Sequence, residues 1–427
     1  MTGRRGGVAG AAALLTVLAA ASAVLGLARD VVIAAVFGAG AELDAYLVAQ
    51  GLMNLVLALA AGAMAKAGVP VVSRSIAEGD GDGAHHSALV ALSITTLVLA
   101  VGSIVMWLAA GTVVDALAPG FDAEQEQLAR TLTRIVLVAT VLIAGTNLLA
   151  GIAQAHRRFF WSGVQGIPFN VVMIVAAAVF GPRYGVRALA VGFVAGSGAR
   201  LLAQFVPLRA IGLRLVPTLD VRDPGFRRIA RLLPPLLLGS AIGNVNTLVD
   251  RAVGSGAGEG TIAALNYGWR VAALAEMLLI APLITALYPA LGAATAPGEL
   301  ARLVQRGTAT MATILAPLVA LLVVAREPII ALVFGRGDFD GDDVERTATA
   351  LVWYAPAVVA LGWREVASRA FYAVGDARSP MLVALGAMAL NVLGDVTLGV
   401  RLGVPGLAAS TTASLAFAAA MTTIVLA

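Results

Sequence analysis

The sequence predicts an all-α polytopic membrane protein with about twelve transmembrane helices, arranged as two six-helix bundles that are related by a parallel internal repeat. Three observations support this prediction. The composition is too apolar for a protein surrounded by water, long apolar segments recur along the whole chain, and short motifs of the first half reappear in the second.

The composition excludes a soluble globular protein. Of the 427 residues, 59% are hydrophobic and 13% are charged, and the mean hydropathy is +0.91. Soluble domains carry about 25% charged residues, so lipid must solvate much of this chain's surface. There is no cysteine, which excludes disulfides and thiolate metal sites. The formal net charge of +4 is spread thinly between apolar segments, so we expect no nucleic-acid partner.

A membrane-spanning helix needs about 20 mostly apolar residues. The segments of this kind are 8–37, 43–70, 87–113, 128–155, 160–180, 186–207, 229–253, 261–290, 305–324, 347–373, 380–399 and 404–426. They are too long and too continuously apolar for the strands of a membrane barrel, so we expect helices. The first segment resembles a signal peptide, but it continues to Phe37 and we expect it to be retained as a transmembrane helix.

The distribution of arginine predicts the orientation. With a cytoplasmic N-terminus, the cytoplasmic loops hold most of the loop arginines, and the most basic loop, about residues 208–231, lies at the midpoint of the chain. The opposite loops hold the acidic stretches 115–126 and 338–345. Because cytoplasmic loops of membrane proteins carry the excess of basic residues, both termini are predicted to be cytoplasmic.

Four short motifs repeat in order between the halves, at a nearly constant offset along the chain. The pairs are Gly38–Glu42 with Gly254–Glu259, Val69-Pro70 with Tyr288-Pro289, Asn170-Val171 with Asn391-Val392, and Gly185–Ala190 with Gly403–Ala408. We therefore expect two six-helix domains, residues 1–215 and 216–427. Six is an even number, so both halves face the same way, and paired bundles of this kind are typical of transporters.

Charged residues inside membrane spans are costly and usually mark transport routes. The first set is Arg29 and Asp30 in the first span, Asp44 at the start of the second, and Arg270 in the eighth. Because a guanidinium group stays charged and binds phosphate through two hydrogen bonds, this set is a candidate binding site for a phosphorylated substrate. The alternative is a purely structural ion pair, Arg29 with Asp30 or Asp44.

A second set carries oxygen ligands. Asn391 and Asp395 are one helical turn apart, on one face of the eleventh span. Asp250 in the seventh span and Thr411 in the twelfth belong to the same half and could add oxygens, which suit hard cations. The alternative is an Asp395 that is hydrogen-bonded to a neighbouring helix or paired with an arginine. The pattern assigns no role to Glu276, Arg134 and Arg200.

Several motifs resemble the MurJ/MviN family of lipid II flippases, whose superfamily also contains polysaccharide flippases and multidrug antiporters. These motifs are Leu25–Asp30, Ala35–Gly40, Leu43–Tyr46, Ala264–Arg270 and Ala370–Pro380, and the similarity covers essentially the whole chain. The chain departs from the family's pattern at Ala23, Leu57, Ala58 and Ala61, where basic or acidic residues are expected.

The resemblance implies a flippase of the bacterial inner membrane that moves a polyprenyl-pyrophosphate-linked glycan outward by alternating access, without enzymatic chemistry. Arg29, Asp44 and Arg270 match family residues needed for transport, and we expect Asp30 to act with them. Asp250, Asn391, Asp395 and Thr411 match a sodium site of the family. Membrane lipids are expected partners, and cell-wall synthesis enzymes are candidate partners.

Two other functions compete with this one. A cation-coupled multidrug antiporter would rely on carboxylates and aromatic residues more than on arginines. In a non-transporting membrane scaffold for cell-wall synthesis, the missing charged residues would mark the decay of transport, and a closed, apolar interface between the bundles would favour this function.

Overall fold

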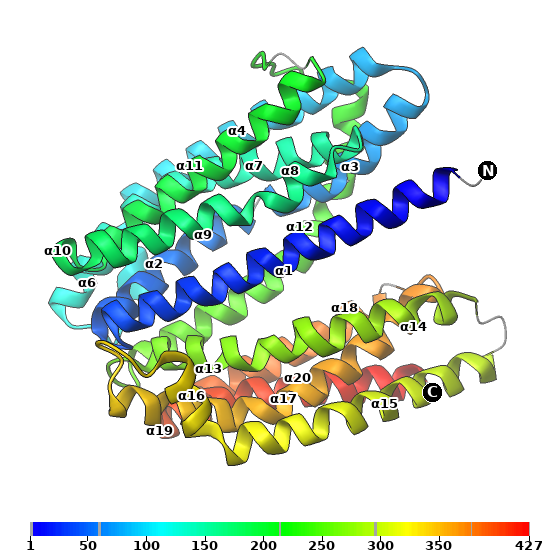
Figure 1. The fold of residues 1–427 in the computed structure, drawn as a ribbon. Coiled ribbons are helices and arrows are strands. Elements are labelled where there is room, and N and C mark those ends of the chain that lie inside the picture. Colours follow the sequence, from blue (N-terminus) through cyan, green and yellow to red (C-terminus); the bar gives the residue numbers. More distant parts are fainter. Residues whose placement is uncertain (1–2, 59–60, 213–214, 294–296, 377, 427) are drawn as a thin grey trace. The chain divides into compact units, whose positions relative to one another are not determined.

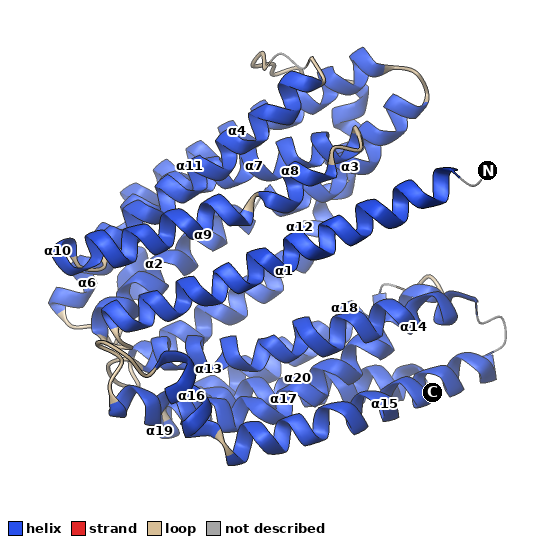
Figure 2. Ribbon diagram, viewed as in Figure 1, coloured by secondary structure: helices blue, strands red, loops and turns tan. Residues whose placement is uncertain are grey.

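The structure is a computed structural model that describes residues 3–58, 61–212, 215–293, 297–376 and 378–426. The described part contains helices and connecting loops and no strand, so the predicted all-α class is confirmed (Figure 2). The predicted span 43–70 and the basic loop 208–231 each contain two residues that lie outside the described part.

The helices of the first half follow one another closely along the chain (Figure 1). Their bounds are α1 Gly3–Phe37, α2 Ala41–Ala58, α3 Ala61–Ala77, α4 Gly81–Leu108, α5 Ala110–Leu117, α6 Ala123–Val136, α7 Val138–Ala155, α8 Phe159–Val164, α9 Gly166–Val175, the π-helical η1 Ala176–Phe180, α10 Gly181–Tyr184 and α11 Arg187–Ala210.

The helix α12, Pro224–Ser255, crosses the midpoint of the chain. It is followed by α13 Thr261–Ala275, the π-helical η2 Glu276–Ile280, α14 Ala281–Ala293, α15 Pro297–Val324, α16 Arg326–Phe334, α17 Gly341–Ala373, α18 Arg378–Gly394, the π-helical η3 Asp395–Gly399, α19 Val400–Leu402 and α20 Val404–Leu426.

Among the described residues, nine helical stretches are long and apolar enough to cross a membrane. They correspond to nine of the twelve predicted spans. The other three predicted spans lie in α2 with α3, in α12 and in α17. The count of twelve transmembrane helices is therefore not confirmed, although the described residues of the predicted spans are almost all helical.

Two backbone features recur at matching positions of the sequence repeat. The π-helical turns η1 and η3 begin at Ala176 and at Asp395. Gly185 and Gly403 both end a short helix with a positive φ, of 60° and 64°. A side chain is strained in this conformation, which explains the two glycines. Both pairs keep the offset along the chain that the repeated motifs have.

The chain divides into two compact units. Unit 1 comprises Met1–Phe37, Ala45–Ala116 and Ala123–Val245, and unit 2 comprises Gly38–Asp44, Leu117–Asp122 and Asn246–Ala427. The helix α12 contributes to both, since the change from one unit to the other falls between Val245 and Asn246. The duplicated domains 1–215 and 216–427 stay a prediction.

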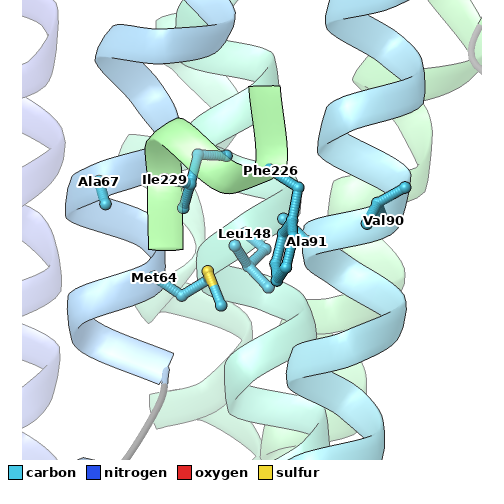
Figure 3. Packing of buried hydrophobic residues seen from close by; sticks show 7 residues of the cluster. All are labelled: Met64, Ala67, Val90, Ala91, Leu148, Phe226 and Ile229. Atoms are coloured by element: carbon cyan, nitrogen blue, oxygen red, sulfur yellow. The ribbon is translucent and has the colours of Figure 1, made fainter. Parts of the chain in front are cut away.

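Unit 1 has an apolar core between α3, α4, α7 and α12 (Figure 3). Its buried residues are Met64 and Ala67 of α3, Val90 and Ala91 of α4, Leu148 of α7, and Phe226 and Ile229 of α12. Ile229 is completely buried. The start of α12 therefore belongs to the packing of unit 1, which holds this helix in a fixed position against α3 and α7.

Close helix packing in unit 1 depends on a small residue at Gly192 of α11. A Cβ atom at this position would collide with the Cβ of Ala176, whereas a Cβ at Gly198 of the same helix would meet nothing within 4 Å. Small residues allow membrane helices to approach closely. We expect Gly192→Ala to reduce the free energy of unfolding by about 1–3 kcal/mol.

The matched substitution Gly198→Ala is expected to leave stability unchanged or to raise it slightly, because alanine favours the helix. Thermal unfolding of the purified protein in detergent measures both effects. Equal melting temperatures for the two variants would contradict the packing described for Gly192.

Candidate functional site

The first candidate cluster surrounds Arg29 of α1 in unit 1. Its Nε and Nη2 donate to Oδ1 of Asp30 at 2.9 and 2.7 Å, and its Nη1 donates to Oδ1 of Asn170 at 3.0 Å. Nδ2 of Asn170 in turn donates to the carbonyl oxygen of Ser22 at 3.0 Å. The guanidinium also lies 5.8 Å from the ring centroid of Phe169.

These contacts fix the Arg29 guanidinium inside unit 1. Its side chain is only 16% exposed, and a buried cation without a partner would cost several kcal/mol. Asp30 neutralises the charge, while Asn170 and Phe169 of α9 hold the orientation. The sequence allowed a structural ion pair of Arg29 with Asp30 as the alternative to substrate binding, and the structure contains this ion pair. The ion pair is compatible with substrate binding at the remaining face of the guanidinium.

Asp44 of α2 has a different environment, within unit 2. Its side chain is buried, and its two carboxylate oxygens accept from the backbone N–H groups of Gly260 at 2.8 Å and Ala263 at 2.7 Å. These groups belong to the start of α13, where N–H groups have no partner within the helix. Asp44 therefore caps α13, and its carboxylate also complements the positive end of the helix dipole.

Neighbouring contacts attach the segment Gly38–Asp44 to the rest of unit 2. The backbone N–H of Ala39 donates to Asp343 at 2.8 Å, and that of Ala41 donates to Glu259 at 3.2 Å. Arg346 links the same two acidic residues, because it donates to Oδ1 of Asp343 and to the carbonyl oxygen of Glu259, each at 2.6 Å. The loop between α1 and α2 is thus held by side chains from the start of α17 and from the loop that precedes α13.

Arg270 of α13 belongs to unit 2, and its side chain is exposed. Arg29 belongs to unit 1. That the two arginines act on one substrate stays a prediction.

The second candidate cluster is centred on Asn391 of α18 and lies within unit 2. Its Nδ2 donates to Oδ1 of Asp250 at 3.1 Å and to Oδ2 of Asp395 at 2.6 Å. Its Oδ1 accepts from the hydroxyl of Ser414 at 3.1 Å. Asn391 and Asp395 are fully buried. Three of the four side chains predicted as cation ligands are therefore in direct contact.

The two carboxylates of this cluster lie close together, because both accept from the same amide nitrogen of Asn391. Oδ1 of Asp395 is buried and makes no hydrogen bond with a described residue. Two buried carboxylates repel each other strongly when both are charged, so the cluster requires a proton or a cation to be stable. A hard monovalent cation fits the donors present, which are carboxylate, amide and hydroxyl oxygens.

Thr411 of α20 lies beside the cluster. It borders a cavity of about 290 Å³ in unit 2, together with Asp250, Thr247, Trp269 and Tyr354. The Thr411 hydroxyl donates to the carbonyl oxygen of Leu407 at 3.3 Å, a long hydrogen bond that leaves its lone pairs available. Asp250 is thus the residue that connects the buried cluster with the cavity.

The two clusters occupy equivalent positions of the sequence repeat. Asn170 follows Arg29 along the chain by the same number of positions, 141, as Asn391 follows Asp250. In unit 1 the amide oxygen of Asn170 accepts from Arg29, and in unit 2 the amide nitrogen of Asn391 donates to Asp250. The same asparagine position therefore holds a cation in one unit and a carboxylate in the other.

Sequence analysis missed several partners of these clusters. Asn170 was noted only as a repeated motif, and Phe169, Ser414 and Tyr354 were not singled out. The repeat itself could have identified Asn170, since it is the counterpart of Asn391. Nothing in the sequence indicates that Phe169 and Ser414 face these clusters, because their contacts join helices that are distant along the chain.

We expect Asp44→Ala to destabilise the start of α13. Two buried N–H groups would lose their acceptor, at a cost of about 1–3 kcal/mol each. Hydrogen exchange of the amides of residues 260–267 should become faster.

The control is Asp80→Ala, which removes an exposed helix cap that accepts from the N–H of Gly83 at 2.9 Å. This substitution should cost about 1 kcal/mol and leave α13 unaffected. Unchanged exchange in Asp44→Ala would show that the cap is dispensable.

Comparison with known proteins gives one consistent result. The family profile described as "Lipid II flippase MurJ" matches residues 33–427. The lipid II flippase MurJ of Burkholderia cenocepacia is 30% identical over 413 residues, which cover 93% of this chain and 80% of the relative. The probable lipid II flippase MurJ of Vibrio cholerae is 29% identical over 408 residues, 92% of this chain and 78% of the relative.

Two solved structures share the fold. A lipid II flippase MurJ in an inward closed conformation superposes with a TM-score of 0.84 at 22% identity, over 96% of this chain and 87% of that one. An inward-facing multidrug resistance transporter of the MATE family superposes with a TM-score of 0.78 at 17% identity, over 95% of this chain and 93% of that one.

Proposed function

The chain belongs to the lipid II flippase MurJ family, and on this premise we propose that it carries a polyprenyl-pyrophosphate-linked glycan, of the lipid II type, outward across the bacterial inner membrane by alternating access. It is a multi-pass membrane protein. In the proposed orientation both termini are cytoplasmic, and the protein catalyses no covalent reaction.

The observation that carries this proposal is the buried Arg29 cluster. A guanidinium held in place by Asp30 and Asn170 inside a membrane protein can take up a phosphate group without first reorganising. Arg29 and Arg270 bind the pyrophosphate in this proposal. Asp30 keeps Arg29 paired when the substrate has left, and Asp44 acts indirectly, through the start of α13 that carries Arg270.

The two competing functions are less well supported. A multidrug antiporter shares the fold, but it gives no reason for an arginine that is buried and oriented by three side chains. A scaffold would need no charged cluster inside its helices, since replacing buried charges by apolar residues usually stabilises a protein. Cell-wall synthesis enzymes remain candidate partners of the flippase.

We also propose that sodium is the coupling ion. Asp250, Asn391, Asp395 and Thr411 would hold it, and the ion would supply the positive charge that two adjacent carboxylates need in a dry helical bundle. Asp395 already offers a buried oxygen that makes no hydrogen bond with a described residue. Since a bound ion biases a protein towards the conformation that binds it better, occupancy of this cluster can select between transport states.

Complementation tests the transport proposal. A strain depleted of its own lipid II flippase should grow when it expresses this protein, and Arg29→Gln should abolish growth because the oriented guanidinium is lost. Arg134→Gln is the control. The guanidinium carbon of Arg134 lies 4.8 Å from the ring centroid of Trp107, and the Arg134 side chain makes no described contact with either cluster. Failure of the unmodified protein to rescue growth, when it is present in the membrane, favours the scaffold.

Replacement of sodium tests the coupling proposal. Transport by the unmodified protein in reconstituted vesicles should fall when sodium is replaced by choline. Asp395→Asn removes one carboxylate and should leave a transport rate that no longer responds to sodium. The exposed Glu299→Gln, at the start of α15, should behave as the unmodified protein. If Asp395→Asn kept the full response to sodium, the assignment of this cluster would be wrong.

A further inference from the structure

Arg200 of α11 has no role in the site described above. It lies about 20 Å along the helix from the start of α11 and about 15 Å from its end. An arginine so far from both ends cannot readily place its charge in the interface by extending its side chain. Its Nε is buried, and no described residue accepts a hydrogen bond from it. Intramembrane cations of this kind usually have a functional partner.

The contact that Arg200 makes is with the ring of Phe169, whose centroid lies 5.6 Å from its guanidinium carbon. Arg29 lies 5.8 Å from the same centroid. Two guanidinium groups, from α1 and α11, therefore share one aromatic ring of α9. Phe169 is held in place by edge-to-face contact with Phe193 at 5.2 Å and is only 8% exposed.

The two arginines differ in how their charges are neutralised. Asp30 neutralises Arg29 at 2.7 Å, whereas the Phe169 ring offers Arg200 only a cation–π interaction, which is worth about 2 kcal/mol when it is desolvated. The pair together with Asp30 thus carries one net positive charge inside unit 1. Such a charge favours the binding of an anion.

Polar groups next to Arg200 also lack partners. Ser197 and Gln204 lie one turn before and one turn after it on α11, and both are fully buried. Oγ of Ser197 and Oε1 of Gln204 have no described hydrogen-bond partner. Buried polar atoms are nearly always hydrogen-bonded, so this face of α11 is suited to water or to a polar ligand.

We propose that Arg200 is a further phosphate-binding residue, in addition to Arg29 and Arg270, and that together with Arg29 it distinguishes the diphosphate group of the lipid carrier from a monophosphate. This inference rests on the proposed function. Arg29 binds one phosphate, and Arg200, on the same aromatic ring, binds the other. Each guanidinium can form two parallel hydrogen bonds with phosphate oxygens, and both guanidinium groups lie within 6 Å of the centroid of the same ring.

The test compares two lipids with the same tail, undecaprenyl pyrophosphate and undecaprenyl monophosphate. Their binding to the purified protein in detergent is measured by microscale thermophoresis. The unmodified protein should prefer the pyrophosphate. Arg200→Met should weaken pyrophosphate binding about tenfold or more, because a charge-assisted contact is lost, and should leave monophosphate binding unchanged. Arg29→Gln should weaken the binding of both lipids.

Stability separates binding from a structural role. Arg200→Met removes an incompletely paired buried charge, so its melting temperature should equal or exceed that of the unmodified protein. Arg134→Met is the control, because this arginine also stacks on an aromatic ring, that of Trp107, but is exposed; its lipid preference should not change. If Arg200→Met does not fold, Arg200→Lys is tested in its place. Lysine keeps the charge but lacks the planar guanidinium that forms two parallel hydrogen bonds, so the preference for pyrophosphate over monophosphate should fall severalfold.

The outcomes separate this inference from the proposed function. An unmodified protein that binds neither lipid would overturn both. If Arg29→Gln loses affinity while Arg200→Met and Arg200→Lys keep the full preference for pyrophosphate, the proposed function stands and the role of Arg200 is refuted.

Discussion

The structure depends on one constraint, that a charge inside a helical membrane protein must have a partner. Lipid offers none, and an isolated buried ion costs several kcal/mol. The chain satisfies this constraint in Arg29 with an adjacent acid, an amide and an aromatic ring. It satisfies the constraint only partly around Asp395, where two carboxylates share one amide nitrogen. The partly satisfied groups are the ones that can respond to a substrate or an ion.

The repeat explains how one chain could acquire both clusters. Arg29 with Asp30, and Asp250 with Arg251, occupy matching positions of the two halves with their charges in reverse order. The partner asparagines, Asn170 and Asn391, match in the same way. An amide suits both arrangements, because its oxygen accepts from a cation and its nitrogen donates to a carboxylate. A polar position repeated in the two halves thus accounts for both the proposed anion-binding cluster of unit 1 and the proposed cation-binding cluster of unit 2.

The helices and the polar residues Arg29, Asp30, Asp250, Asn391 and Asp395 could be predicted from the sequence, because apolar length and intramembrane polar groups are local signals. The contacts could not be predicted. That Asp44 caps α13, for example, depends on a hydrogen bond between two residues that are 216 positions apart in the chain. The role of Phe169 was equally hidden, since a phenylalanine in an apolar helix looks the same whether it faces lipid or two arginines. Spacing within one helix can be read from sequence, whereas contacts between distant helices require the tertiary structure.

Transport of a pyrophosphate-linked lipid by the buried arginine cluster can be measured directly in vesicles that contain the purified protein and fluorescent lipid II, with a quencher that cannot cross the bilayer. Label in the inner leaflet is expected to become accessible to the quencher with the unmodified protein and to stay protected with Arg29→Gln. Equal protection in protein-free vesicles and in vesicles with the unmodified protein would contradict this expectation.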